Sequence, residues 1–264
     1  MKNKTIATII ICMLLLPGIL ITSTVGENSK IISSSGNTLY VGGSEPGNYT
    51  TIQGAINVAT SGNTIFVFNG TYIENIIIDE SISLIGENKQ TTTINGNNGI
   101  ALTITANSVT ITGFTIQNSE QGILLDHTSN SNIHENIISN NNCGIFLHGA
   151  ISNTIKNNII SDNECGIEIG PSASPGKFHP SNSNVISSNN IIDNIKSAFD
   201  NYEGSYDKNY WTSNYWSEWM GLKFEFLNIF PKIIFGRPIP ILGELGFPMC
   251  FTFDKTPSET QYTL

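Results

Sequence analysis

The sequence predicts an all-β solenoid, in which short strands form coils that stack on one another. Isoleucine recurs every 22 residues at Ile116, Ile138 and Ile160, and a fixed period of this size indicates one structural unit repeated along the chain. Apolar residues alternate with polar ones in short runs that Asn, Ser and Gly interrupt, which is the period of a strand and not of a helix. No segment of the repeat is long enough for a crossover helix, so strand–helix repeats are disfavoured.

The repeat runs from Val109 to Asp200. Three copies share a Gly-Ile pair that lies 22 residues from the next one: Gly122-Ile123, Gly144-Ile145 and Gly166-Ile167. A fourth copy, which contains Ile186 and Ile191, is offset by 31 residues instead of 22. The extra residues fall near Gly170–Asn184, a segment rich in Pro, Ser and Gly, which predicts a loop that leaves one coil.

Stacked coils place equivalent residues in columns about 4.8 Å apart. We expect the isoleucine columns to fill the interior, at about 1.5–3 kcal/mol for each fully buried side chain. Asparagine forms two further columns, in which the side-chain amides can hydrogen-bond from coil to coil: Asn136, Asn158 and Asn189, and Asn141, Asn163 and Asn194. Asparagine also tolerates the left-handed backbone that a sharp corner needs, so these residues are assigned a structural role.

This pattern, from about Leu39 to Asp200, resembles the right-handed parallel β-helix of the pectin-lyase-like superfamily, and more narrowly the NosD-like β-helix repeat proteins. The segment YTTIQGAINVATSGNTIFVFNGTYIENIIIDESISLIGE is similar to the amino-terminal region of those proteins. The run FPKIIFGRPIPI is similar to the tails of archaeal-type cell-surface members. The resemblance implies one β-helix of about six coils, with a helix covering its amino-terminal end and a cap at the other.

Four segments are expected along the chain. Residues 1–26 have the basic start and apolar run of a signal peptide, which we expect to be cleaved; an uncleaved membrane anchor is the alternative. Residues 27–62 contain a first strand and the cap helix, and residues 63–201 form the β-helix. Residues 202–264 are rich in aromatic residues and proline, which favours a carboxy-terminal cap over a surface that binds sugars or a membrane.

The first part of the chain is expected to contain the cap helix and the less regular coils. Ile52, Ala55 and Ile56 have helical spacing, and Thr50 or Thr51 can cap that helix. An uncovered end of the coil would expose unpaired backbone groups, which explains why a cap is needed. Strands are expected at six places before the regular repeat: Leu39–Val41, Ile65–Phe68, Ile76–Ile78, Ile82–Gly86, Thr92–Asn95 and Ile100–Ile104.

Three residues that can bind metals meet in the register of the repeat. His148 stacks over Asp126, and His127 is the neighbour of Asp126 in the chain. The resemblance to NosD carries an association with copper, so these three residues are the candidates for a metal site. Copper(I) prefers clusters of Cys, Met and His, and the sequence has no such motif. We therefore predict no metal site and no cofactor.

Catalysis is not supported by the residues of the coils. The well-known enzymes of the superfamily act on acidic polysaccharides, and the resemblance implies carboxylates and an arginine on one exposed sheet. The single arginine of the chain is Arg237, outside the coils, and Asp162 and Asp193 share a column where a corner Asn otherwise sits. Glycoside hydrolysis needs two carboxylates at a set separation. No catalytic residue is assigned, and a divergent polysaccharide lyase or hydrolase is kept as an alternative.

Two further residue types bear on an exported chain. Cys143 and Cys165 are 22 residues apart and should stack as free thiols, although a relaxed corner would allow a disulfide. Asn48 and Asn69 each begin a glycosylation sequon, which an exported protein can use.

Composition and architecture together lead to a functional prediction. The chain has a formal net charge of −9 and no basic cluster, which argues against a nucleic-acid partner. We predict a secreted or cell-surface scaffold that binds a polysaccharide or cell-surface glycan without catalysis. It would contact a membrane only through an uncleaved amino-terminal segment. A NosD-like copper-handling accessory protein is the second alternative.

Overall fold

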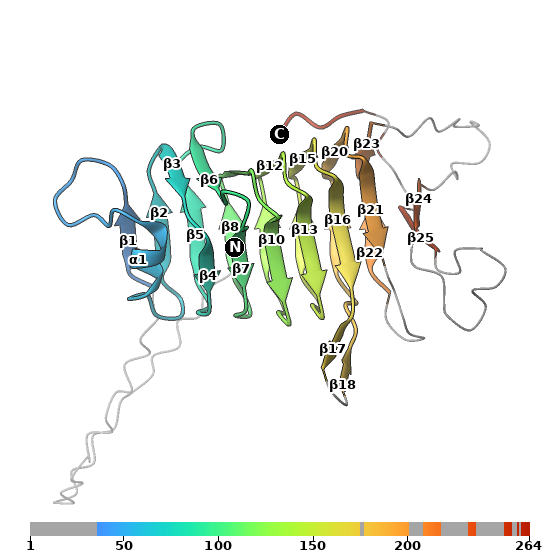
Figure 1. Ribbon diagram of the computed structural model, residues 1–264, viewed down its shortest axis with the longest axis horizontal. Coiled ribbons are helices and arrows are strands. Elements are labelled where there is room, and N and C mark those ends of the chain that lie inside the picture. The colour runs from blue at the N-terminus through green and yellow to red at the C-terminus, as the bar shows by residue number, and fades with distance from the viewer. Residues whose placement is uncertain are drawn as a thin grey trace, which may run out of the picture. The chain divides into compact units, whose positions relative to one another are not determined.

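The computed structural model describes residues 36–174, 177–200, 208–217, 232–235, 251–254, 258 and 260–264. In these residues the chain forms a parallel β-helix, so the predicted fold class is confirmed (Figure 1). The expected signal peptide and most of the expected carboxy-terminal cap, including Trp219, lie outside the described residues. Among the helices that the structure describes, none is long and apolar enough to cross a membrane.

A complete coil contributes one strand to each of three parallel stacks, which we call the first, second and third faces. The first face consists of β1 (Thr38–Val41), β2 (Thr64–Val67), β5 (Ser83–Gly86), β8 (Thr110–Thr112), β11 (Asn132–His134), β14 (Thr154–Lys156), β19 (Val185–Ser187) and β22 (Tyr210–Thr212). The second consists of β3 (Gly70–Ile73), β6 (Thr92–Asn95), β9 (Thr115–Gln117), β12 (Ile137–Ser139), β15 (Ile159–Ser161), β20 (Asn190–Ile192) and β23 (Tyr215–Trp216). The third consists of β4 (Ile76–Ile78), β7 (Ile100–Ile104), β10 (Gln121–Asp126), β13 (Cys143–His148), β16 (Cys165–Gly170) and β21 (Lys196–Asp200). An antiparallel pair, β24 (Lys232–Phe235) and β25 (Phe251–Asp254), links the first face to the third.

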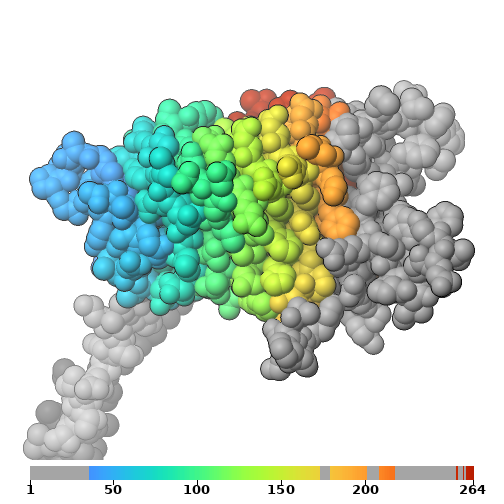
Figure 2. All heavy atoms as spheres, viewed as in Figure 1, coloured from blue at the N-terminus to red at the C-terminus, as the bar shows by residue number. Residues whose placement is uncertain are grey.

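The β-helix has more coils than the repeat predicts. Eight strands of the first face stack in chain order, so the described chain has about eight coils instead of about six. Figure 2 shows the coils side by side in the order of the sequence. In the last coil Trp211 and Trp216 pair with Ile186 and Ile191, and they are only 2% and 1% exposed. Tryptophan thus replaces isoleucine in the core, and the β-helix continues beyond residue 201.

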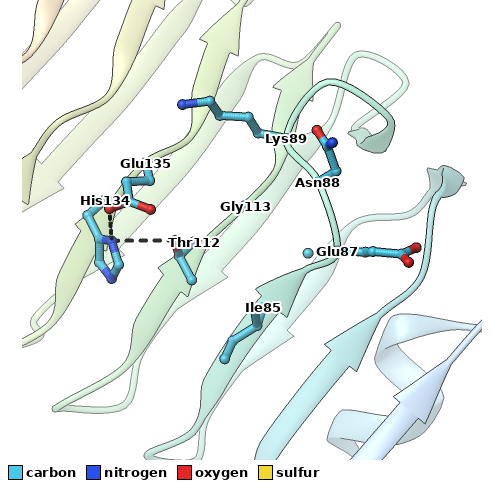
Figure 3. Close-up of a pocket in the computed structure, with 9 residues that line it drawn as sticks. Ile85, Glu87, Asn88, Lys89, Thr112, Gly113, His134 and Glu135 are labelled. Carbon is cyan, nitrogen blue, oxygen red and sulfur yellow. Dashed lines mark hydrogen bonds and ion pairs between the residues drawn. The ribbon is translucent and has the colours of Figure 1, made fainter. Parts of the chain in front are cut away.

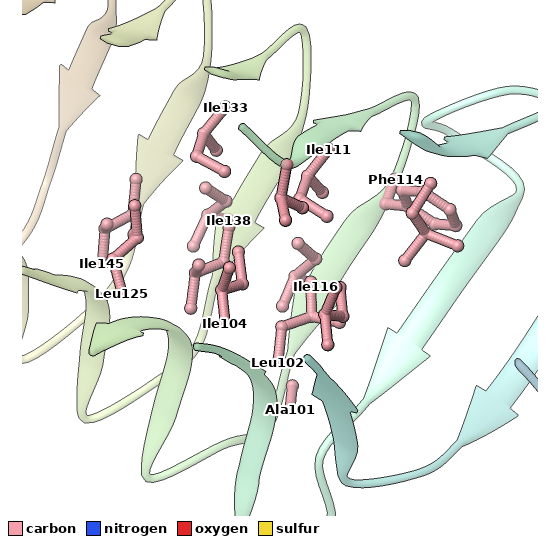
Figure 4. Close-up of a cluster of buried hydrophobic side chains, with 14 of the residues drawn as sticks. Ala101, Leu102, Ile104, Ile111, Phe114, Ile116, Leu125, Ile133, Ile138 and Ile145 are labelled. Atoms are coloured by element: carbon pink, nitrogen blue, oxygen red, sulfur yellow. The ribbon is translucent and has the colours of Figure 1, made fainter. Parts of the chain in front are cut away.

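One interior column of isoleucines, which we call the isoleucine file, lies where the repeat predicts it. Ile116, Ile138 and Ile160 pair through β9, β12 and β15, and none of the three side chains is exposed. The file continues to Ile94 on one side and to Ile191 on the other. Figure 4 shows part of this core, in which isoleucine and leucine side chains from neighbouring coils pack together. Residues 22 apart therefore lie on adjacent coils.

A ladder of buried asparagine amides runs along one corner of the coils. Nδ2 of Asn136 donates to Oδ1 of Asn158 at 3.2 Å, and Asn158 donates in the same way to Asn189 at 3.0 Å. Each Oδ1 also accepts the backbone N–H of the preceding ladder residue. The ladder continues through Asn214 and ends at the carboxylate of Asp254. The last position only has to accept, so an aspartate can fill it.

Two more ladders follow the same rule at other corners. The predicted column of Asn141, Asn163 and Asn194 is confirmed, with Nδ2-to-Oδ1 contacts of 3.1 and 2.9 Å. A further ladder, which the sequence analysis did not predict, joins Asn153, Asn184 and Asn209 and ends at Asp200. The three ladders satisfy amide groups that would otherwise be buried without partners, which is the costly case.

One detail of the predicted corners was wrong. The ladder asparagines do not have the left-handed backbone; the residue before each ladder asparagine other than Asn209 has it. Asn157, which precedes Asn158, has φ 55°, and Asp162, which precedes Asn163, has φ 56°. The left-handed residue turns the chain, and the next residue directs its amide inward. The corner position of Asp162 is confirmed.

The amino-terminal helix covers the edge strand of the third face. Helix α1 (Ile52–Ile56) begins after Thr51, whose Oγ1 accepts the N–H of Gly54 at 3.1 Å, so the predicted helix and cap are confirmed. The side-chain amide of Gln53 bonds both backbone groups of Ile77 in the edge strand β4, at 2.8 and 3.3 Å. The side chain of Gln53 therefore bonds backbone groups of β4 that a further parallel strand would otherwise pair.

The insertion near Gly170–Asn184 is more ordered than a loop. It contains an antiparallel hairpin of β17 (Ser172–Ser174) and β18 (Lys177–His179). Figure 1 shows the hairpin leaving the end of β16. Ser172, at its base, is only 3% exposed, so the base packs against the coil.

The end of one ladder predicts a pH dependence. Asp200 is 1% exposed, and its burial raises the pKa from the usual 3.8 to about 6, although Trp211 Nε1 and Asn209 Nδ2 donate to the carboxylate. The folded chain thus binds a proton that the unfolded chain releases, and the contribution of Asp200 to stability falls as pH rises from about 4 to about 6, by about 3 kcal/mol at most.

Denaturant titrations of Asp200→Asn and of the original chain between pH 4 and pH 6 test this. We expect the variant to gain stability relative to the original chain as pH rises, because its amide has no charge to bury. A difference in unfolding free energy that is constant over this range contradicts the assignment.

Candidate functional site

A groove lies on the first face, where β5, β8 and β11 adjoin. It has a volume of about 410 Å³. Figure 3 shows its side chains, which come from three neighbouring coils. They include Ile85, Glu87, Lys89, Thr112, His134 and Glu135. Ile85, Thr112 and His134 are paired in register on adjacent strands, so the groove follows one outward column of the coil.

The turn after β5 forms a wall of the groove. The backbone oxygen of Asn88 accepts the N–H groups of Thr91 and Thr92 at 2.9 and 2.7 Å, and its Oδ1 accepts that of Gln90 at 2.9 Å. Thr115 Oγ1 donates to the backbone oxygen of Lys89 at 2.5 Å. These bonds fix a turn of irregular length, which holds the side chains of Asn88 and Lys89 at the rim.

Aromatic side chains continue the same outward column beyond the groove. Tyr40 pairs with Phe66, and Phe66 pairs with Ile85 at the groove. Phe68 packs on both aromatic rings, with ring centroids 6.1 Å from Tyr40 and 5.2 Å from Phe66. Tyr40 is 45% exposed. The column therefore passes from an aromatic surface into a polar groove.

His134 is the central polar side chain of the groove. Its Nδ1 lies 3.4 Å from Thr112 Oγ1 and 3.9 Å from Glu135 Oε1. Burial lowers the pKa of His134, and Lys156 lowers it further, whereas Glu135 acts in the opposite direction. The ring is thus neutral near pH 7, and can donate one hydrogen bond and accept another.

The carboxylates of the groove do not form a pair. Glu87 Oε2 accepts the backbone N–H of Asn69 at 2.9 Å. Figure 3 shows Glu87 pointing away from His134 and Glu135. The arrangement offers donors, acceptors and an aromatic surface, which suits binding of hydroxyl groups better than acid–base chemistry between two carboxylates.

The structure brings together the three residues considered as metal ligands. Asp126 and His148 pair in register between β10 and β13, which confirms the predicted stacking. Asp126 Oδ1 lies 2.7 Å from His127 Nδ1 and 2.9 Å from His148 Nδ1. The ring of His179, from the hairpin, lies 5.1 Å from that of His127. Sequence reasoning missed His179, because the insertion has no place in the 22-residue register.

The two cysteines stack on adjacent strands, as the repeat predicts. Cys143 on β13 is opposite Cys165 on β16, and both are free thiols. A hydrogen bond with Cys165, together with burial, raises the pKa of Cys143. The thiol of Cys143 is therefore protonated at neutral pH and is a poor nucleophile or metal ligand.

The two sequon asparagines differ in accessibility. Asn48 Nδ2 donates to the backbone oxygen of Gly42 at 2.7 Å and is partly buried. Asn69 is exposed, and its Oδ1 accepts from Thr91 Oγ1 at 2.6 Å. Nδ2 of Asn48 is partly buried and already bonded, whereas Asn69 is exposed, so Asn69 is the more accessible glycan acceptor of the two.

Comparisons with known proteins identify one family and one partial relative. The model of the family described as periplasmic copper-binding protein (NosD) matches residues 18–221. A cell surface glycoprotein of Methanothermus fervidus is 34% identical over 92 residues, which are 34% of this chain. The chain covers only 16% of the length of that protein.

Two solved structures are similar in fold. The A-module of a mannuronan C-5 epimerase from Azotobacter vinelandii is 15% identical with a TM-score of 0.50, over 69% of this chain and 49% of that one. An alginate lyase from a Paenibacillus species is 19% identical with a TM-score of 0.49, over 62% of this chain and 63% of that one. At these identities the likeness concerns the fold alone.

Proposed function

The chain belongs to the NosD family, and from that premise we propose that it is an exported surface scaffold which binds a neutral polysaccharide in the groove without cleaving it. The observation that carries the proposal is the outward column of the first face. It begins with the aromatic rings of Tyr40 and Phe66 and continues to Thr112 and His134. A polymer lying along this column crosses successive coils.

The column has the two surfaces that a sugar polymer requires. Aromatic rings can pack on the apolar faces of sugar rings, and Tyr40 adds a hydroxyl group at its tip. Hydroxyl groups of the polymer need fixed donors and acceptors, which His134, Thr112 and Asn88 supply. The turn that carries Asn88 is held by its own hydrogen bonds, so little order has to be gained on binding.

Charge favours a neutral polymer over an acidic one. Glu87 and Glu135 line the groove against one cation, Lys89, and the whole chain carries a formal charge of −9. A polyuronate would bring further negative charge to this surface, and like charges across an interface suppress binding. The surface location rests on the apolar amino-terminal segment and on the likeness to a cell surface glycoprotein.

Affinity electrophoresis of the full chain through gels that contain neutral or acidic polysaccharides tests the proposal. We expect retardation by at least one neutral polymer, and weaker retardation by polyuronates. Tyr40→Ala and His134→Ala should each weaken binding about tenfold, the equivalent of about 1.4 kcal/mol. Tyr210→Ala is the matched control, because Tyr210 is exposed on the same face but lies three strands beyond β11.

The alternatives give different results in the same experiments. A lyase or hydrolase releases unsaturated products or new reducing ends from the polymer during incubation. A protein that handles copper and has no glycan ligand shows no retardation by any polymer. Either result, or equal loss of binding in Tyr210→Ala, argues against the proposed groove.

A further inference from the structure

Three side chains of metal-binding type converge at the corner where the hairpin β17–β18 leaves β16. The oxygen Asp126 Oδ1 lies between two imidazole nitrogens, at 2.7 Å from His127 Nδ1 and 2.9 Å from His148 Nδ1. Ligand atoms of all three residues lie within 4.8 Å of one another. Between 34% and 39% of each side chain is exposed, so an ion and its water molecules can reach these atoms.

The backbone of His127 turns the chain at a corner of the coil. Its φ is 54°, the left-handed value that other corner residues such as Asn157 and Asp162 also have. The equivalent residue of the next coil is Gly149, with φ 61°, since Asp126 pairs with His148. Glycine can therefore form this corner, and the fold does not require histidine there.

The surroundings of His127 are shaped to its ring. A Cβ atom on Gly149 would lie 3.2 Å from His127 Cδ2 and 3.3 Å from Nε2, closer than ordinary contact. On another side, the ring of His179 meets that of His127 edge to face, at 5.1 Å and 81°. The glycine leaves space for the imidazole, and the hairpin supplies a contact that orients it.

We propose that Asp126, His127 and His148 bind one divalent transition-metal ion through Asp126 Oδ1 and the two Nδ1 atoms. Two neutral imidazoles and one carboxylate suit Zn²⁺, Cu²⁺ or Ni²⁺, whereas Ca²⁺ and Mg²⁺ prefer oxygen ligands throughout. Metal–ligand bonds of about 2.1 Å require each Nδ1 atom to move about half an ångström farther from Asp126 Oδ1. Each imidazole then carries its proton on Nε2, and the three protein ligands leave coordination positions open to water.

The second group of metal-binding residues in the described chain is a poorer candidate. Cys143, Cys165 and Glu168 also lie close together. Metals bind the thiolate, and the hydrogen bond with Cys165 and the burial that raise the pKa of Cys143 both disfavour that form. The ion is therefore assigned to the histidine cluster on the third face. This cluster shares no residue with the groove on the first face, so the two proposals can fail separately.

Isothermal titration of the chelator-treated full chain with Zn²⁺, Ni²⁺ and Cu²⁺, each alone, tests the site. We expect one ion per chain, and an electron paramagnetic resonance spectrum of the Cu²⁺ form with two imidazole nitrogens bound. Asp126→Asn and His148→Ala should each weaken binding by about tenfold or more. His179→Ala, which removes only the orienting contact, should weaken it less.

His134→Ala is the matched control, because His134 also stands beside a carboxylate on the coil surface but lies outside the cluster. This variant should keep one ion per chain. The thermal unfolding of every variant without metal shows whether it is folded. Undiminished binding in folded Asp126→Asn and His148→Ala, or equal loss in His134→Ala, would overturn the assignment.

Discussion

Replacing Asn158 by alanine is expected to lower the free energy of unfolding by about 3–5 kcal/mol, because several buried polar groups lose their partners together. Asn158 Oδ1 accepts the backbone N–H of Asn136 at 3.0 Å, and its Nδ2 donates to the backbone oxygen of Ile133 at 2.9 Å. Its amide also links Asn136 to Asn189 along the ladder. The whole side chain is buried, so water cannot replace these bonds in the folded chain.

Urea titrations of the Asn158→Ala variant and of the original chain measure this effect. Lys156→Ala is the matched control, two residues away on the outward side of β14, and should change the free energy of unfolding by no more than about 0.5 kcal/mol. A loss in Asn158→Ala that equals that of the control would show that the ladder contributes little. A change in how steeply the unfolding free energy depends on urea concentration, without a shift of the unfolding midpoint, would instead indicate an effect on the denatured state.

The features that the sequence predicted are those that repeat. Ile116, Ile138 and Ile160 keep the spacing of 22, and so do the ladder residues Asn141 and Asn163. Stacking converts equal spacing into contact, because each coil advances by one strand separation. The register alone was therefore enough to place the core, two of the ladders, and His148 over Asp126.

The features that were missed are those that leave the register. Asp200 and Asp254 end two ladders, but the residue 22 positions before each of them is not an asparagine. The 22-residue repeat therefore does not mark either aspartate as a ladder residue. Trp211 fills an isoleucine position, and its residue type suggested a separate cap. Asn88 belongs to a turn of irregular length, and His179 to the insertion. Each proposed site thus combines residues in register with one residue outside it, Asn88 in the groove and His179 beside the histidine cluster. The repeat therefore identified the fold better than the sites.

Replacing Ile160 by alanine tests the core in the same way and is expected to cost about 2–5 kcal/mol. Ile160 has no exposed surface and is paired with Ile138 on one side and with Ile191 on the other. Both neighbours belong to strands whose backbones are joined by parallel pairing and by the ladders at the adjacent corners. The coil therefore cannot close around the lost atoms, and a cavity remains in the file.

Ile160→Val separates the two parts of this loss. It removes one methylene group and should cost about 0.5–1.5 kcal/mol, whereas a much larger loss would indicate a constraint of shape. Ile195→Ala is the matched control, since Ile195 is 81% exposed and has little packing to lose. If the chain with Ile160→Ala unfolds at the same urea concentration as that control, the isoleucine file is not what stabilises the coil.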